Sequence, residues 1–205
     1  MSNRPSLNED ERDCLQELIN ISYGSATAAI AEIIEKFATL NIPRVEIVSL
    51  KEFEEFFKGK LSNYNTHYVT NQLIHGTIDG ESMFVIDEES TQNLGKEFNI
   101  LQDDAYEDEL KDVVLEISNI ITSTTLSKFA SLIEAVITFS PPSIKILNSV
   151  EEFNEGCNYN YKHIIIISTG MKFKDQNITA ELLILSKDES ICYIKKSINK
   201  ILEEF

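Results

Sequence analysis

Tryptophan is absent from the 205-residue chain, and cysteine, histidine and glycine are scarce, with 3, 3 and 7 residues. The cysteines are odd in number and form no CxxC pair, which favours a reduced protein over a disulfide-stabilised secreted one. The histidines, His67, His75 and His163, lie in strand-like segments without ligand spacing, so we expect no metal site. The sequence also contains no glycine-rich phosphate loop and no serine or cysteine coupled to a base.

Basic residues are also few. The 18 lysines and arginines are outnumbered by 34 aspartates and glutamates, which gives a net charge of −16 and a pI of about 4.6. Such a surface repels phosphate backbones and anionic headgroups, so we expect no nucleic-acid partner and no membrane insertion. No apolar run approaches the roughly 20 residues that span a bilayer. The first residues, MSNRPSLNEDERD, lack a signal-peptide core, which leads us to expect a cytoplasmic protein.

The sequence does contain an order of elements that occurs twice. Apolar residues recur at helical spacing from about 8 to 39, followed by a strand in NIPRVEIVSL, a short helix in KEFEEFFKGK, a hairpin around Asp79-Gly80 and a short helix in EESTQNLGKEFNI. A second long helix is predicted over about 104–138, followed by a strand in PPSIKILNSV, a hairpin around KDQN and a closing helix over about 188–204.

These two halves predict a pseudo-symmetric fold. We expect an α/β (α+β) fold in which two helix–strand–hairpin halves, over approximately 8–100 and 104–204, form one continuous sheet of about six strands. Two long helices should pack on that sheet, and residues 1–205 should form a single domain. The offset between the halves is constant at 99 residues for three pairs: Glu17 and Glu116, Asn20 and Asn119, and Pro43 and Pro142.

A polar stripe marks each long helix. The first stripe consists of Asp13, Glu17, Asn20 and Gly24, and the second of Asp112, Glu116, Asn119 and Ser123. Spacings of +4, +3 and +4 hold each set within about 60° of arc, so we expect both stripes on the outer face of a helix that packs on the sheet. A solvated face explains one such stripe, but repetition at a fixed offset favours a function. A glycine in mid-helix costs about 1 kcal/mol relative to alanine, and it leaves room for close approach.

A glutamate one turn before an asparagine suits one kind of chemistry. A carboxylate accepts a hydrogen bond from a lysine, while a carboxamide orients a water through both a donor and an acceptor. Hydrolysis of a phosphoryl group needs positioning and charge compensation more than covalent help. The residues therefore favour a helical surface that assists hydrolysis of a phosphoryl group held elsewhere.

The spacing [Asp/Ser]-x3-Glu-x2-Asn-x22-Pro resembles the signature of the CheC/CheX/FliY chemotaxis phosphatases. The first match runs from Asp13 to Pro43 and the second from Asp112 to Pro142, and both agree at every specified position. The segments ELINISYGSATAAIAEII and LEISNIITSTTLSKFASLI are similar to the family's two long helices. The resemblance covers nearly the whole chain and is strongest for CheC, which has two sites in a single domain.

This resemblance implies a phosphatase that hydrolyses the aspartyl-phosphate of a CheY-type response-regulator receiver. It implies that Glu17 and Glu116 contact the receiver's active-site lysine, and that Asn20 and Asn119 orient the attacking water. The Mg²⁺ ion would belong to the receiver, so no cofactor is expected in this chain, and the deamidase CheD is a further partner that the resemblance suggests. The other stripe residues are expected to support partner binding: Asp13, Gly24, Asp112 and Ser123.

Two other functions stay open. A non-catalytic receiver-binding, flagellar-switch or adaptor module would use the same helical face only to hold a partner. An unrelated enzyme would need a reactive constellation of its own, which the sequence does not show. The relative activity of the two sites is open as well, because Ser25 stands where the family often has a second asparagine, and the bulky Tyr23 lies beside Gly24.

Overall fold

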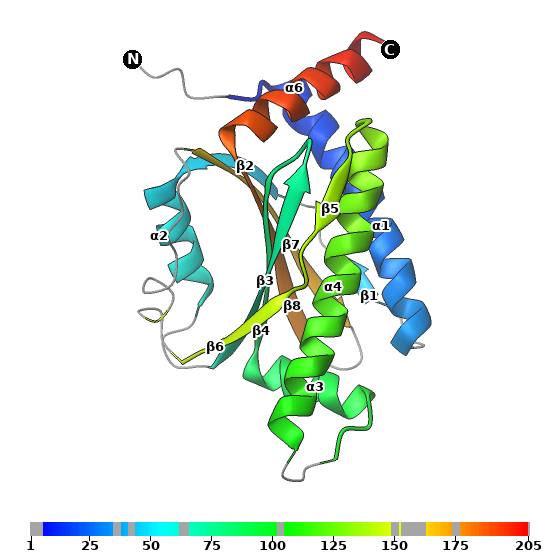
Figure 1. The fold of residues 1–205 in the computed structure, drawn as a ribbon, viewed down its shortest axis with the longest axis vertical. Helices are drawn as coiled ribbons and strands as arrows, with labels where there is room; N and C mark the ends of the chain where they lie inside the picture. The colour runs from blue at the N-terminus through cyan, green and yellow to red at the C-terminus, as the bar shows by residue number, and fades with distance from the viewer. Residues whose placement is uncertain are drawn as a thin grey trace.

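The computed structural model describes residues 6–34, 38–40, 44–61, 66–101, 105–148, 152, 163–173 and 177–204. In these residues a β-sheet is covered on both faces (Figure 1). Two long helices lie side by side on one face, a short helix lies on the other, and two more helices lie toward opposite ends of the molecule. They are, in that order, α1 (Glu9–Ile34), α4 (Tyr106–Leu132), α2 (Leu50–Lys60), α3 (Glu88–Glu97) and α6 (Asp188–Glu203).

The described strands are β1 (Ala38–Leu40), β2 (Arg44–Ser49), β3 (His67–Gly76), β4 (Gly80–Asp87), β5 (Ile137–Phe139), β6 (Ser143–Leu147), β7 (His163–Phe173) and β8 (Ile178–Ser186). They form one antiparallel sheet in the order β1-β7-β8-β4-β3-β5, in which β2 also pairs with β7 and β6 with β3. At one edge of the sheet β1 and β2 pair with β7 one after the other, and at the other edge β5 and β6 pair with β3. The eight described strands therefore make a sheet six strands wide. The predicted mixed fold with one continuous sheet is confirmed.

The strand register follows a pseudo-twofold axis. At the centre of the sheet β4 pairs with β8, and Met83 lies opposite Leu183, the residue 100 positions further along the chain. Two residues that are equivalent by this offset and also face each other must lie on the axis that relates the halves. The ladders at the two edges of the sheet are also equivalent. The β3–β6 ladder pairs His67 with Leu147, and the β7–β2 ladder pairs Ile164 with Val48.

The larger apolar core lies between the sheet and the two long helices. Leu15 and Ile19 from α1 and Val114 and Ile117 from α4 are at most 1% exposed there. Burial of a leucine or isoleucine side chain is worth about 1.5–3 kcal/mol, so these positions fix which helix faces turn inward. The remaining face of each long helix is left to solvent or to a partner.

A smaller core lies under α2 on the opposite face of the sheet. Phe53 and Phe57 are fully buried there, with ring centroids 5.9 Å apart. The helix begins at a capping box, in which the Ser49 side chain accepts from the backbone N–H of Glu52 while the Glu52 carboxylate accepts from the backbone N–H of Ser49. This cap fixes where the chain leaves β2 for α2.

Both long helices end earlier than the apolar periodicity predicts. The predicted helix ends at about 39 and 138 are wrong, because α1 ends at Ile34 and α4 at Leu132, and short strands β1 and β5 follow. Glu134 leaves α4 with a left-handed φ of 56°, so the turn contains no glycine that would mark it in the sequence. Ile137 and Thr138 are β-branched and pair with β3, although they also continue the helical spacing.

Candidate functional site

The polar stripe of α1 faces outward, as predicted. Asp13, Glu17, Asn20 and Gly24 are all exposed. A Cβ atom built on Gly24 would meet nothing within 4 Å, so packing within the chain does not require a glycine there. The side chain of Asn20 makes no hydrogen bond with the described part of the chain. Helical spacing places the Cβ atoms of Glu17 and Asn20 about 5–6 Å apart. The carboxylate and the carboxamide are both exposed and can contact a partner.

The stripe of α4 lies on the equivalent face but is less open. Asp112 and Glu116 are exposed, whereas Asn119 and Ser123 are half-buried. The Ser123 hydroxyl donates to the carbonyl oxygen of Ile120 at 3.4 Å. The acid of this pair is therefore as accessible as that of the first pair, but its amide is not.

The two stripes lie on neighbouring helices that run in opposite directions. The blue N-terminal half of α1 lies at the upper end of Figure 1, and the N-terminal half of α4 lies at the lower end. Glu17–Asn20 and Glu116–Asn119 each belong to the N-terminal half of their helix. The two pairs therefore lie on different helices and are displaced in opposite directions along the helical layer.

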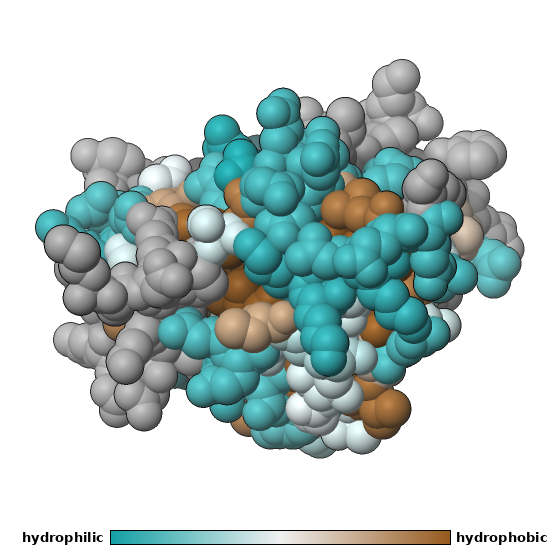
Figure 2. Space-filling model, turned by 90° about the horizontal axis from the view of Figure 1, so that it is seen from above, coloured by the Kyte–Doolittle hydropathy of each residue, from teal (hydrophilic) through white to brown (hydrophobic). Residues whose placement is uncertain are grey.

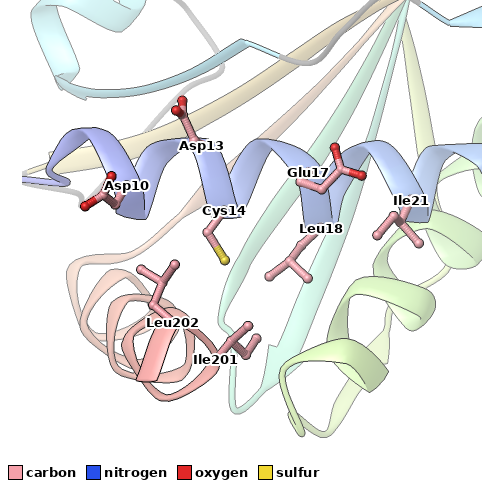
Figure 3. Close-up of a pocket in the computed structure, with 8 residues that line it drawn as sticks. All are labelled: Asp10, Asp13, Cys14, Glu17, Leu18, Ile21, Ile201 and Leu202. Carbon is pink, nitrogen blue, oxygen red and sulfur yellow. The ribbon is translucent and has the colours of Figure 1, made fainter. Parts of the chain in front are cut away.

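A groove runs between α1 and α6 beside the first stripe (Figure 3). Its volume is about 680 Å³. In Figure 3 Cys14 and Leu18 point toward α6, whereas Asp13 and Glu17 point away from it, so the groove is apolar inside and acidic along one edge. Seen from above, the surface is mostly hydrophilic with hydrophobic patches between the hydrophilic parts (Figure 2). The lining residues are Asp10, Asp13, Cys14, Glu17, Leu18, Ile21, Ile201 and Leu202.

Cys14 is a thiol that lines this groove. Burial raises the pKa of Cys14, so the thiol stays protonated near neutral pH and is not an activated nucleophile. Within the described ranges, no group of three or more His, Cys, Asp or Glu residues is placed to hold a metal ion. None of the described helices combines the length and the apolar character needed to cross a membrane.

Glu11 ties α6 to the start of α1, a role that the sequence did not reveal. Its carboxylate accepts hydrogen bonds from the backbone N–H of Asn8 at 2.8 Å and from Asn199 at 3.0 Å, and it lies 3.1 Å from the Lys195 ammonium. Glu11 is only 2% exposed. Burial alone would raise its pKa, but the three hydrogen bonds and the lysine charge outweigh burial and hold the pKa of Glu11 below its ordinary value.

The other half uses apolar packing at the positions equivalent to Glu11 and Lys195. An offset of 99 residues takes Glu11 to Leu110, and the offset of 100 residues takes Lys195 to Gly95. A Cβ atom built on Gly95 would lie 2.5 Å from a methyl carbon of Leu110, so the leucine fills the space that the lysine occupies in the first half. The halves share a backbone plan but hold their end helices by different interactions.

Tyr23 does not reach the first stripe. It is 1% exposed and belongs to the large core, so its ring turns inward although the helix places it only about 60° from Asn20. Burial raises the pKa of Tyr23 and keeps the phenol neutral. The bulk of Tyr23 therefore does not obstruct the surface beside Gly24.

The amide of the second stripe is held by a residue that the sequence analysis missed. Gln72 on β3 is 3% exposed, and its Nε2 atom donates to Asn119 Oδ1 at 2.9 Å and to the Ser140 carbonyl oxygen at 2.9 Å. One signal was present in the sequence. Tyr68 and Ile74, at even positions of the same strand, belong to the core under α4, so alternation places Gln72 on that face as a polar residue among apolar ones.

The proline of the motif lies close to this contact. Between the pairs Asn71–Ser143 and Ile74–Phe139, three residues of the edge segment oppose two residues of β3, which is the count of a β-bulge. Pro142 lies in this bulge directly before β6, and Ser140 begins it. Pro142 therefore shapes the segment whose carbonyl group anchors Gln72. Pro43, its counterpart, lies outside the described residues.

No family model matches the sequence. Solved structures do match the fold. FliY of Thermotoga maritima superimposes with a TM-score of 0.73 at 16% identity, over 96% of this chain and 99% of that one. FliM in a FliM–SpeE complex from H. pylori gives 0.64 at 10% identity, over 95% and 97%. CheX in a CheX–CheY–BeF3–Mg²⁺ complex from Borrelia burgdorferi gives 0.52 at 14% identity, over 83% and 99%.

The chain therefore has the fold of the FliY, CheX and FliM chemotaxis proteins. The fold expected from the sequence resemblance is confirmed over nearly the whole chain. At identities of 10–16% the likeness concerns the fold, and the roles of Glu17, Asn20, Glu116 and Asn119 stay predictions.

Proposed function

We propose that this protein hydrolyses the aspartyl-phosphate of a CheY-type response-regulator receiver. The observation that carries the proposal is the position of the two Glu-x2-Asn pairs, one on each of two pseudo-symmetric helices, in which Glu17, Asn20 and Glu116 are exposed and Asn119 is half-buried. Solvation alone does not require an acid and an amide at equivalent places on both helices. A surface that acts twice on the same kind of partner does require an acid and an amide at equivalent places.

In the proposed reaction the receiver's phosphorylated aspartate docks against one helix face. Glu17, or Glu116 at the second site, accepts a hydrogen bond from the lysine ammonium of the receiver. Asn20 or Asn119 holds a water by its carboxamide, and the water oxygen attacks phosphorus in line. The bond from phosphorus to the aspartate oxygen breaks, the carboxylate leaves with the electron pair, and inorganic phosphate is released. The receiver's Mg²⁺ would offset charge on the phosphoryl group.

Charge and shape support a receiver as the partner. The chain's charge of −16 favours a partner with a basic patch, such as the surroundings of a receiver's lysine. Beside Glu17, Ile21 and Leu202 are 44% and 37% exposed, which offers apolar area for docking at the first site. The neighbour CheX was solved together with CheY, which supports the same class of partner here. The proposal places the protein in the cytoplasm, and CheD stays a second proposed partner.

A non-catalytic adaptor is the second candidate function, because FliM has the same fold and is found in a complex with a different partner, SpeE. Such a module would use the outer helix faces for docking alone. The retained amides argue against it, since docking does not need a carboxamide beside each acid.

The test is the lifetime of the receiver's phosphate. A panel of phosphorylated receivers in Mg²⁺ is followed for loss of phosphate with and without the protein. Loss faster than autodephosphorylation for at least one receiver is the expected result and identifies the substrate. Tight binding with an unchanged lifetime would instead establish the adaptor, and absence of both binding and acceleration would overturn both functions.

Changing Gly24 to alanine is expected to affect stability and activity in opposite directions. The new Cβ meets nothing within the chain, so the helix should gain about 0.5–1 kcal/mol in urea unfolding. The same methyl group would stand where the receiver approaches, so kcat/KM of the first site should fall by about threefold or more when measured in an Asn119→Ala background. Gly59→Ala on α2 also meets no atom and serves as the matched control, with a similar gain in stability and no loss of rate.

A further inference from the structure

We propose that Gln72 is a positioning residue for the second site, which it orders by holding the carboxamide of Asn119, and that the described residues give the amide of the first site no such support. The inference rests on the proposed function for its kinetic consequence. Its structural content, an amide held by Gln72 at one site and an amide without a partner among the described residues at the other, stands independently of that function.

The orientation of both amides follows from a backbone group. The Ser140 carbonyl oxygen can only accept, so the Gln72 atom that faces it must be the donor Nε2. The same nitrogen contacts Asn119, so the Asn119 atom at this contact must be the acceptor Oδ1. Reversing either amide would place two donors or two acceptors together. The Nδ2 group of Asn119 therefore points away from Gln72.

Burial makes this arrangement rigid. Gln72 is 3% exposed on β3, which pairs with strands on both sides, and its Oε1 atom finds no partner among the described residues, so only its Nε2 group makes hydrogen bonds there. One turn further along α4, the Thr122 hydroxyl is hydrogen-bonded at 2.9 Å to Ser82, the residue that pairs with Gln72 across β3 and β4. Two polar contacts thus fix the segment of α4 that carries Asn119.

The first site has a different chemistry at the equivalent positions. Thr122 and Ser82 correspond to Tyr23 and Leu182, which are both buried in the apolar core. Asn20 is exposed and has no hydrogen-bond partner among the described residues. No described residue orders the α1 amide before the receiver binds, whereas Gln72 orders the α4 amide beforehand. Ordering beforehand reduces the entropy lost on reaching the transition state.

The kinetic test uses a chain in which Asn20→Ala leaves the second site alone. With a phosphorylated CheY-type receiver and Mg²⁺, adding Gln72→Met should lower kcat by about three- to tenfold and leave KM nearly unchanged, because buried Gln72 does not touch the receiver. In an Asn119→Ala chain the held amide is absent, so Gln72→Met should add no further loss. Additive losses, or a faster Gln72→Met enzyme, would overturn the proposal.

Thr70→Val is the matched control. Thr70 lies two residues before Gln72 on the same face of β3, is 2% exposed, and has no hydrogen bond to Asn119. It should leave kcat unchanged in the Asn20→Ala chain, so that a general effect of altering the core beneath α4 can be recognised. A loss equal to that of Gln72→Met would show that Gln72 acts only through packing.

A second measurement needs no receiver and separates this inference from the proposed function. Side-chain NH₂ relaxation in the ¹⁵N-labelled protein should give a high order parameter for Asn119, about 0.8 or above, and a low one for Asn20, below about 0.6. Gln72→Met should lower the value for Asn119 and leave Asn20 unchanged. Equal mobility of the two amides in the wild-type chain would overturn the inference even if the protein proves to be a phosphatase.

Discussion

The double variant Asn20→Ala with Asn119→Ala is expected to lose the acceleration of receiver dephosphorylation by about 100-fold or more. Each asparagine is proposed to align the attacking water, and alanine supplies neither a donor nor an acceptor. Asn20 is exposed and Asn119 is half-buried, and alanine is a better helix former than asparagine at both positions. Gln72 keeps its hydrogen bond to the Ser140 carbonyl, while its second N–H loses the Asn119 acceptor, so a loss of about 1 kcal/mol in stability is expected from this change. Phosphate loss from a saturating receiver, compared with autodephosphorylation, measures the effect.

The control for this loss is an exposed amide elsewhere. Gln92 lies on α3, is exposed, and contacts Glu88 at 3.5 Å within the same helix. Gln92→Ala should keep the full rate. Receiver binding by the double variant, measured with a non-hydrolysable phosphoryl mimic on the receiver, should fall far less than the rate, because Glu17 and Glu116 are retained. A double variant that keeps half of the acceleration would contradict the assignment of both amides.

Repetition in the sequence was sufficient to predict the main elements of the fold. The same helical spacing, strand and hairpin occur in both halves at a nearly constant offset, and this predicted one sheet with two long helices. The ends of those helices could not be predicted, because the left-handed turn at Glu134 uses a residue without turn preference. Strands β1 and β5 were also missed. Each consists of three residues that pair with a sheet edge, and only the folded sheet defines the position of that edge.

The outward orientation of the polar stripes was predictable from helical spacing, whereas their inequality was not. Spacing within a helix is local, so it placed Glu17, Asn20, Glu116 and Asn119 on outer faces. The contact between Gln72 and Asn119 spans 47 residues and depends on the strand register and on the bulge before Pro142. A glutamine at a core position of a strand is a visible signal, but nothing in the sequence states which helix residue covers it.

The two halves also differ in how they hold their end helices, which matters because α6 forms one wall of the groove beside Glu17. The Leu110–Gly95 packing of the second half does not depend on charge. The Glu11–Lys195 contact of the first half does, and the Glu11 carboxylate also supplies half of a capping box at the start of α1, since it accepts from the Asn8 backbone N–H at 2.8 Å while Asn8 Oδ1 accepts from the Glu11 backbone N–H at 2.8 Å. Acid should therefore weaken the attachment of the end helix in the first half and not in the second.

Replacing Glu11 by alanine is expected to lower the free energy of unfolding by about 2–3 kcal/mol at pH 7. The change removes three charge-assisted contacts and half of the helix cap, but the Lys195 side chain is 39% exposed and can return to water, which limits the loss. The folded pKa of Glu11 lies below its unfolded value of about 4.5, so its contribution is fully present above that pH and is lost as the pH falls through the folded pKa. Urea unfolding at pH 7 and at about pH 3 measures the difference from wild type, which should shrink in acid.

The ion pair between Glu134 and Lys200 provides the matched control. Its atoms are 2.8 Å apart, but both side chains are largely exposed, at 75% and 60%. Solvent screens such a pair, so Glu134→Gln should shift the unfolding midpoint little at either pH. Because Glu11 is buried and ties α6 to α1, its loss should also loosen the groove and lower receiver turnover at the first site while the second site keeps its rate. A loss that persists unchanged at about pH 3 would show that Glu11 acts through packing and not through its charge.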